Sequence, residues 1–264
     1  MRPTRQSALL SAPLLLCAFA SAAGNGNIVV IGDEWVLSNT AFGAIGNSAA
    51  LLTLNAAALL DGNGTDIAIF SSHPRIGGSQ STEYRTTLGA NGYSITVNPG
   101  AGYSLATMQQ YDFVIVGGLL PGNQAPDAEL LSQYVSSGGS VLLFSGTGLY
   151  GDAFGENAQW APFLGDFGLT LSPEFFPGTN NVIVDTDATP HPLFTGVSKI
   201  FWGYGSEVGV ADPSDPNTTL LSADFTPIPG YDHHSVIGIY QQIPSPGSLV
   251  LLATAGTFRR RRRN

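Results

Sequence analysis

The first half of the chain alternates between short apolar runs and longer helix-like segments. The apolar runs predict buried strands at 27–31, 67–70, 114–116 and 141–144. Residues 93–97 alternate between apolar and polar, which predicts a strand with one solvated face. Helices are predicted where the chain is rich in Ala and Leu or has apolar side chains at helical spacing, at 47–60 and 126–137. This order of elements predicts a parallel sheet covered by helices on both faces.

The pattern weakens after Ser145. Apolar residues at helical spacing predict a helix at 157–167, and short apolar runs predict strands at 182–184, 218–221 and 236–240. We therefore expect one α/β domain, an open parallel sheet with an irregular, loop-rich C-terminal half.

The N-terminus has the pattern of a secretory signal peptide. Arg2 and Arg5 precede an apolar stretch at 8–20, and small residues follow at 20–23. Residues 1–23 are therefore predicted to be a signal peptide. Cys17 is the single cysteine of the chain, so the exported form would have no thiol for a disulfide, a metal site or a nucleophile.

The C-terminus combines a proline motif, an apolar run and an arginine cluster. A helix over 247–258 would span about 18 Å, too short for a bilayer core of about 30 Å. The arginines would stay on the cytoplasmic side, which predicts a transient membrane contact. The alternative is a basic, disordered tail that binds acidic surfaces.

This arrangement resembles the PEP-CTERM sorting signal, which exosortase systems of exopolysaccharide-producing bacteria process. The resemblance implies that residues 243–264 are a sorting tail, that export and exosortase-type machinery are partners, and that the protein reaches the cell surface or extracellular matrix. The middle residue departs from the Pro-Glu-Pro motif of the family. The residues that carry the resemblance are Pro244, Ser245, Pro246, Gly247, Arg259, Arg260, Arg261, Arg262 and Arg263.

The body of the chain, residues 24–242, is strongly acidic. It holds 3 basic residues and all 19 acidic ones, a formal charge of −16. Such a surface repels nucleic acid and anionic lipid, and it suits a neutral glycan, such as an exopolysaccharide, or a matrix rich in divalent cations. No cofactor is expected, because the glycine-rich loop at 146–151 lacks the lysine of a phosphate-binding loop.

Three segments resemble the core of class I glutamine-amidotransferase-like domains: 111–118, 138–146 and 191–197. The resemblance covers 27–208 and implies a flavodoxin-like sheet. The family places a nucleophilic Cys on the turn after the strand at 141–144, where this chain has Ser145, Gly146 and Thr147. The family's glutamine hydrolysis is therefore not expected. We expect a binding or structural domain instead.

An alternative is a secreted hydrolase that acts on a carbohydrate or an ester. Asp33 and Glu34 follow the first strand, and ligands of open α/β sheets bind beyond the carboxyl ends of strands. His73 and His191 also follow predicted strand ends, and either could meet the carboxylates for acid–base chemistry. Trp35 would then be a stacking face. The competing interpretation is a helix N-cap with a buried Trp35, and His-Pro pairs that mark turns.

A calcium-dependent adhesion module is a further alternative. Asp61, Asn63 and Asp66 alternate as calcium ligands do, but Ser72 stands where an EF-hand has its bidentate Glu. The alternative is that these residues form the turn between a helix and a strand, where Asp, Asn and Gly are common. No metal site is predicted with His, since no His-x-x-x-His spacing is present.

Overall fold

The computed structural model describes residues 26–62, 64–186, 190–226 and 233–243. In chain order its elements are β1 (Ile28–Ile31), α1 (Asn39–Ile45), α2 (Asn47–Leu60), β2 (Asp66–Phe70), η1 (Ser79–Ser81), α3 (Thr82–Ala90), β3 (Ser94–Val97), α4 (Leu105–Met108), β4 (Phe113–Gly117), α5 (Ala128–Ser136), β5 (Ser140–Phe144), α6 (Ala153–Gly165), β6 (Leu169–Thr186), η2 (Pro192–Phe194), β7 (Lys199–Val210), β8 (Thr218–Asp224) and β9 (His233–Tyr240). The strands form one sheet in the order β3-β2-β4-β5-β1-β9-β8-β6-β7.

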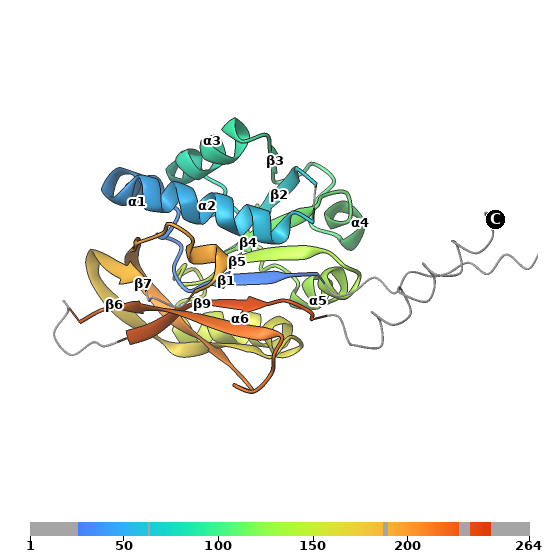
Figure 1. Cartoon of the computed structure of the whole chain (residues 1–264). Coiled ribbons are helices and arrows are strands. Elements are labelled where there is room, and N and C mark those ends of the chain that lie inside the picture. The colour runs from blue at the N-terminus through green and yellow to red at the C-terminus, as the bar shows by residue number, and fades with distance from the viewer. Residues whose placement is uncertain (1–25, 63, 187–189, 227–232, 244–264) are drawn as a thin grey trace, which may run out of the picture.

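The first five strands of this order run parallel, as predicted. In Figure 1, α1, α2 and α3 cover one face of the sheet, and α5 and α6 cover the other. The α/β class and the helices on both faces are therefore confirmed. The predicted helix at 47–60 is found at those residues, and each predicted strand of the first half lies within one or two residues of an observed one.

The sheet is not parallel throughout, and the expected loop-rich C-terminal half is wrong, although the strands predicted at 182–184, 218–221 and 236–240 lie within β6, β8 and β9. Strands β6 to β9 are antiparallel, and β9 extends the sheet by pairing with β1. The β6–β7 ladder has register shifts between Leu171/Phe175 and Pro177/Val182, where proline and glycine interrupt the strand. These interruptions break the alternation from which a strand is predicted. Strand β7 escaped prediction because glycines dilute its apolar residues.

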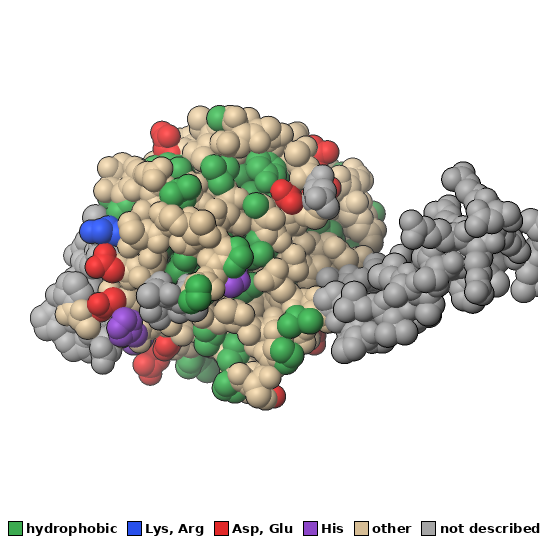
Figure 2. Space-filling view, viewed as in Figure 1, with side chains coloured by type: hydrophobic (Ala, Val, Ile, Leu, Met, Phe, Trp, Pro, Cys, Tyr) green, Lys and Arg blue, Asp and Glu red, His purple; other side chains and the backbone are tan. Residues whose placement is uncertain are grey.

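The described surface offers no free cluster of cations. Arg75 pairs with Glu34, and Arg85 of α3 donates to backbone carbonyl oxygens of the segment that precedes this helix. Lys199 lies 3.8 Å from Asp185. Figure 2 shows scattered red carboxylates and little blue on one face. None of the helices in the described ranges is long and apolar enough to cross a membrane.

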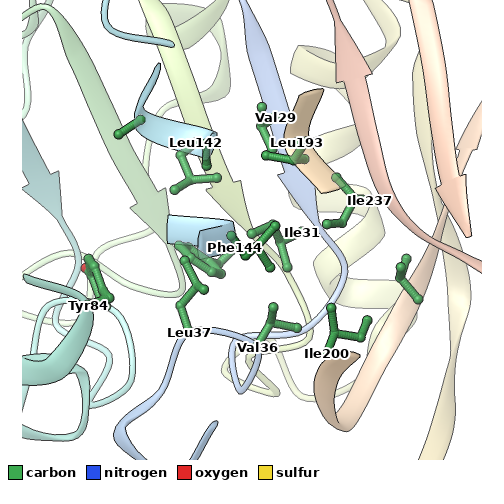
Figure 3. Packing of buried hydrophobic residues seen from close by; sticks show 14 of the residues in the cluster. Val29, Ile31, Val36, Leu37, Tyr84, Leu142, Phe144, Leu193, Ile200 and Ile237 are labelled. Atoms are coloured by element: carbon green, nitrogen blue, oxygen red, sulfur yellow. The ribbon is translucent and has the colours of Figure 1, made fainter. Parts of the chain in front are cut away.

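Two apolar cores lie on opposite faces of the sheet. Val29 and Ile31 of β1 point to one face, where they meet Leu37, Phe144 and Leu193 (Figure 3). Ile28 and Val30 of β1 point to the other face, into a second core to which α5 and α6 contribute. Side chains on both faces are buried, which explains why these strands are continuously apolar. Each such side chain contributes about 1.5–3 kcal/mol.

Strand β7 passes close to the carboxyl end of β1. Ser206 N donates to Gly32 O at 2.9 Å. A Cβ added at Gly205 would overlap the Gly32 carbonyl oxygen, and one at Gly203 would overlap the Trp35 ring. Glycine is therefore required at both positions for a steric reason, independent of turn geometry.

We predict that Gly205→Ala lowers the free energy of unfolding by about 1–3 kcal/mol, because backbone must move to admit the methyl group. Urea unfolding followed by circular dichroism measures the change. Gly43→Ala is the matched control: Gly43 lies within α1 with open space around it, so alanine should stabilise by about 0.5–1 kcal/mol. Equal stability of the two variants would contradict the close approach of β7.

Candidate functional site

The candidate site lies at the carboxyl ends of β1 and β5, which are neighbours in the sheet. The chain leaves β1 for α1 and α2 on one face, and it leaves β5 for α6 on the other. Adjacent strands whose connections go to opposite faces form a topological switch point, where α/β proteins bind their ligands. The turn at 32–36 and the turn at 145–147 meet here.

Asp33 is fully buried and accepts three backbone hydrogen bonds. Its Oδ1 accepts from Trp35 N at 2.9 Å, and its Oδ2 accepts from Gly203 N and from Tyr204 N, the latter at 3.2 Å. Burial raises the pKa of Asp33, while these bonds oppose the rise. The carboxyl group thus joins the turn after β1 to the backbone of β7, and β7 covers it.

Glu34 is also buried and meets a cation. Its Oε1 lies 3.2 Å from Arg75 Nη1, and its Oε2 has no hydrogen-bond partner. Burial, then the charge of Asp33, raise the pKa of Glu34 to about 10, and Arg75 acts against them. At neutral pH the two adjacent carboxyl groups therefore retain a proton. The three amide bonds favour the ionised form at Asp33 and leave the proton to Glu34.

The turn after β5 is closed by a carboxylate from α6. Glu156 accepts from Gly146 N at 2.8 Å and from Thr147 N and Oγ1 at 3.2 and 2.8 Å. Burial raises the pKa of Glu156 to about 7, while these bonds oppose the rise. Ser145 is buried, and its hydroxyl donates to Ile31 O at 3.4 Å. The amides that could form an oxyanion hole are thus occupied, and the hydroxyl is not exposed for attack.

The expected meeting of a histidine with Asp33 or Glu34 does not occur. His73 is buried, and its Nδ1 accepts from Arg75 N at 3.3 Å. Burial, then the charge of Arg75, lower the pKa of His73 to about 4. It is Arg75, two residues further on, that reaches Glu34.

His191 lies at the opposite edge of the sheet. Its Nδ1 accepts from Leu193 N at 3.1 Å, which caps η2. Burial lowers the pKa of His191, and a hydrogen bond that its side chain donates to Gln241 opposes this. Gln241 follows Tyr240, which pairs with Ile28 at the amino end of β1. The strand-end rule misplaced His191 because it assumed parallel strands throughout.

Trp35 is not a free stacking face. The Cζ of Arg75 lies 3.3 Å from the centroid of its ring, and the backbone of Gly203 packs beside the ring. The N-cap of α1 is Ser38, whose Oγ accepts from Ala41 N at 3.2 Å, and not Asp33. The cap expectation for this turn is therefore wrong as well.

Arg75 and Glu156 escaped the sequence prediction. Arg75 is one of only three Lys or Arg residues in 24–242, a segment with 19 acidic residues, and this rarity is a signal that could have identified it. Glu156 lies one residue before the start of the predicted helix, in the first turn of α6.

The candidate calcium loop uses its polar groups internally. Asp61 accepts from the Tyr93 hydroxyl at 2.7 Å, and Asp66 N donates to the Asp112 carboxyl at 2.7 Å. Asn63, the signal peptide and the sorting motif lie outside the described residues. Within the described ranges, no three acidic, His or Cys side chains are grouped to hold a metal ion.

An open pocket of about 430 Å³ lies against the site. Its walls include Glu34, Thr147, Asp152 and Tyr204. No known family model and no curated protein sequence matches the chain. The chemistry of the site is therefore inferred from its geometry.

We predict that the contribution of Glu156 to stability decreases as the pH rises from about 4.5 to 7. The folded pKa of Glu156 lies above the unfolded value near 4.5, so the folded state binds more protons in this window. This carboxyl group should lower the free energy of unfolding by about 2–3 kcal/mol over the window, while the lowered pKa of His73 acts in the opposite direction and the raised pKa of Glu34 in the same one. Chemical unfolding of the wild type and of Glu156→Gln at pH 5, 6 and 7 isolates the contribution of Glu156. A difference between the two proteins that does not change with pH would refute the assignment.

Proposed function

We propose that the protein is exported and that its α/β domain is a non-catalytic binding or structural module at the cell surface or in the extracellular matrix. The closed turn after β5 is the observation that carries this proposal. The hydroxyl of Ser145 is buried, and the backbone amides of Gly146 and Thr147 donate hydrogen bonds to Glu156. A hydrolase at this edge would need an exposed nucleophile and a base within reach, and the described residues here supply neither.

The strand order supports a flavodoxin-like, amidotransferase-like identity for the parallel half. The parallel strands lie in the order β3-β2-β4-β5-β1. If β2 is numbered as the first strand and β1 as the fifth, this is the 2-1-3-4-5 order of flavodoxin-like sheets. The proposed relationship is to the non-catalytic members of that group. The absence of a cysteine from the turn agrees with it.

The proposed location rests on the two ends of the chain. The pattern of residues 1–23 favours secretion, and the pattern of 243–264 favours exosortase-type processing after a transient membrane contact. We propose exopolysaccharide as the partner outside the cell. The body charge of −16 and the engaged state of all three of its cations disfavour nucleic acid.

We predict that the protein recovered from the cell surface lacks both ends, starting near residue 24 and ending near Pro244–Pro246. Intact-mass spectrometry measures both boundaries. Replacing Arg259–Arg263 with alanine should impair processing, because it removes the charges that stop translocation. A surface form that keeps the arginines, or a full-length form found only inside cells, would contradict the proposal.

The same purified protein should hydrolyse chromogenic esters and glycosides no faster than its Ser145→Ala variant. Activity that Ser145→Ala abolishes would show that the turn opens and would overturn the non-catalytic assignment. A finding of this kind would leave the export result intact, so the two parts are tested separately.

A further inference from the structure

We propose that a groove beside the candidate site binds a neutral, hydroxyl-rich glycan chain. This inference rests on the proposed binding function, and it adds the site and the ligand chemistry. The groove consists of two adjoining pockets of about 430 and 350 Å³ that share Asp152, Phe175 and Tyr204. Each pocket falls in the volume range of small-molecule sites, and together they form an extended surface.

Exposed apolar side chains gather at this groove. In the described ranges, four large hydrophobic residues are exposed, and two of them line the groove: Tyr204 (50 %) and Phe154 (70 %). Leu149 (41 %) belongs to the loop at 146–151, but its side chain lies toward Gly118 and lines neither pocket. A cluster of exposed apolar side chains on a soluble domain marks an interaction site.

The aromatic rings provide flat platforms. Phe175 and Tyr204 pack against each other with ring centroids 5.2 Å apart, so each ring supports the other. Half of Tyr204 remains exposed. The C–H face of a sugar ring is apolar and flat, and it stacks on such rings, as other amphipathic ligands do.

The polar groups of the groove match hydroxyl groups. Glu34 lines it and has a buried oxygen, Oε2, without a hydrogen-bond partner. Asp152 and Glu174 add carboxylates, and no lysine or arginine lines either pocket. A hydroxyl both donates and accepts, so it can pair with Glu34 in either protonation state. An anionic ligand would meet the carboxylates of Asp152 and Glu174 and no cation in the lining, which disfavours acidic glycans.

Another pocket, of about 510 Å³ at the ends of β2 and β4, is a weaker candidate. Three of its polar side chains, those of Asn98, Tyr103 and Asp127, are already paired. Asn98 bonds both to the amide and to the carbonyl of Ser71, and Asp127 caps α5. This pocket therefore supplies a control surface.

Affinity gel electrophoresis of the secreted protein tests the inference, with dextran, laminarin and galactomannan as neutral probes and alginate as the acidic one. At least one neutral polymer should retard the protein, and alginate should not. Tyr204→Ala and Phe154→Ala should each weaken retardation about tenfold, since a stacking platform is lost. Tyr204→Phe keeps the ring and should bind nearly as well. Gln124→Ala, in the other pocket, should change nothing.

Each contrary result has a distinct meaning. Neutral binding that survives both groove variants overturns the site and leaves the binding function standing. Alginate binding above that of the neutral polymers overturns the ligand class. Failure of every neutral polymer overturns the inference itself, whereas the proposed function falls only with the hydrolysis and mass-spectrometry results.

Discussion

The hydrogen bonds that Asp33 accepts from Gly203 and Tyr204 connect the two halves of the domain. Asp33 lies on the turn after β1, at the carboxyl edge of the parallel half. Strand β7 of the antiparallel half covers that turn. Hydrogen bonds to a charged acceptor contribute roughly 1.5–3 kcal/mol each, and their loss would leave buried amides unpaired. The close approach also explains why glycines are needed at 203 and 205.

This connection changes the use of the sheet edge. In open α/β folds, the carboxyl edge at a switch point is the usual ligand site. Here β7, Asp33 and Glu156 fill it with internal hydrogen bonds. The remaining space lies further out, among Tyr204, Phe154 and Asp152, where the groove is open. Closure of the edge and exposure of aromatic side chains beside it are thus two results of the same packing.

The sequence allowed the parallel half to be predicted because local pattern determines it. Its strands are buried on both faces and therefore continuously apolar, and α2 is a run of strong helix formers. In the antiparallel half, local apolar runs predicted parts of β6, β8 and β9, but the lengths and the pairing of these strands depend on long-range contacts that no local window contains. Bulges in β6 and glycines in β7 removed the periodic signal there.

The candidate site was predicted in part. The position of Asp33 and Glu34 at a sheet edge followed from the strand before them. Their partners did not, since Arg75 and Gly203 lie 41 and 170 residues away from Glu34 and Asp33 in the chain. His73 was expected nearby, but the loop directs Arg75 to Glu34 instead. Only the three-dimensional path of a loop decides between two neighbours of this kind.

Amide hydrogen exchange at Gly203 and Tyr204 tests the central interaction most directly. The account predicts that both amides exchange as slowly as those of β1 in the native protein. In Asp33→Ala they should exchange at least tenfold faster, while the amides of β2 and β4 stay protected. Unchanged protection of Gly203 and Tyr204 in this variant would show that Asp33 does not hold β7 over the sheet edge.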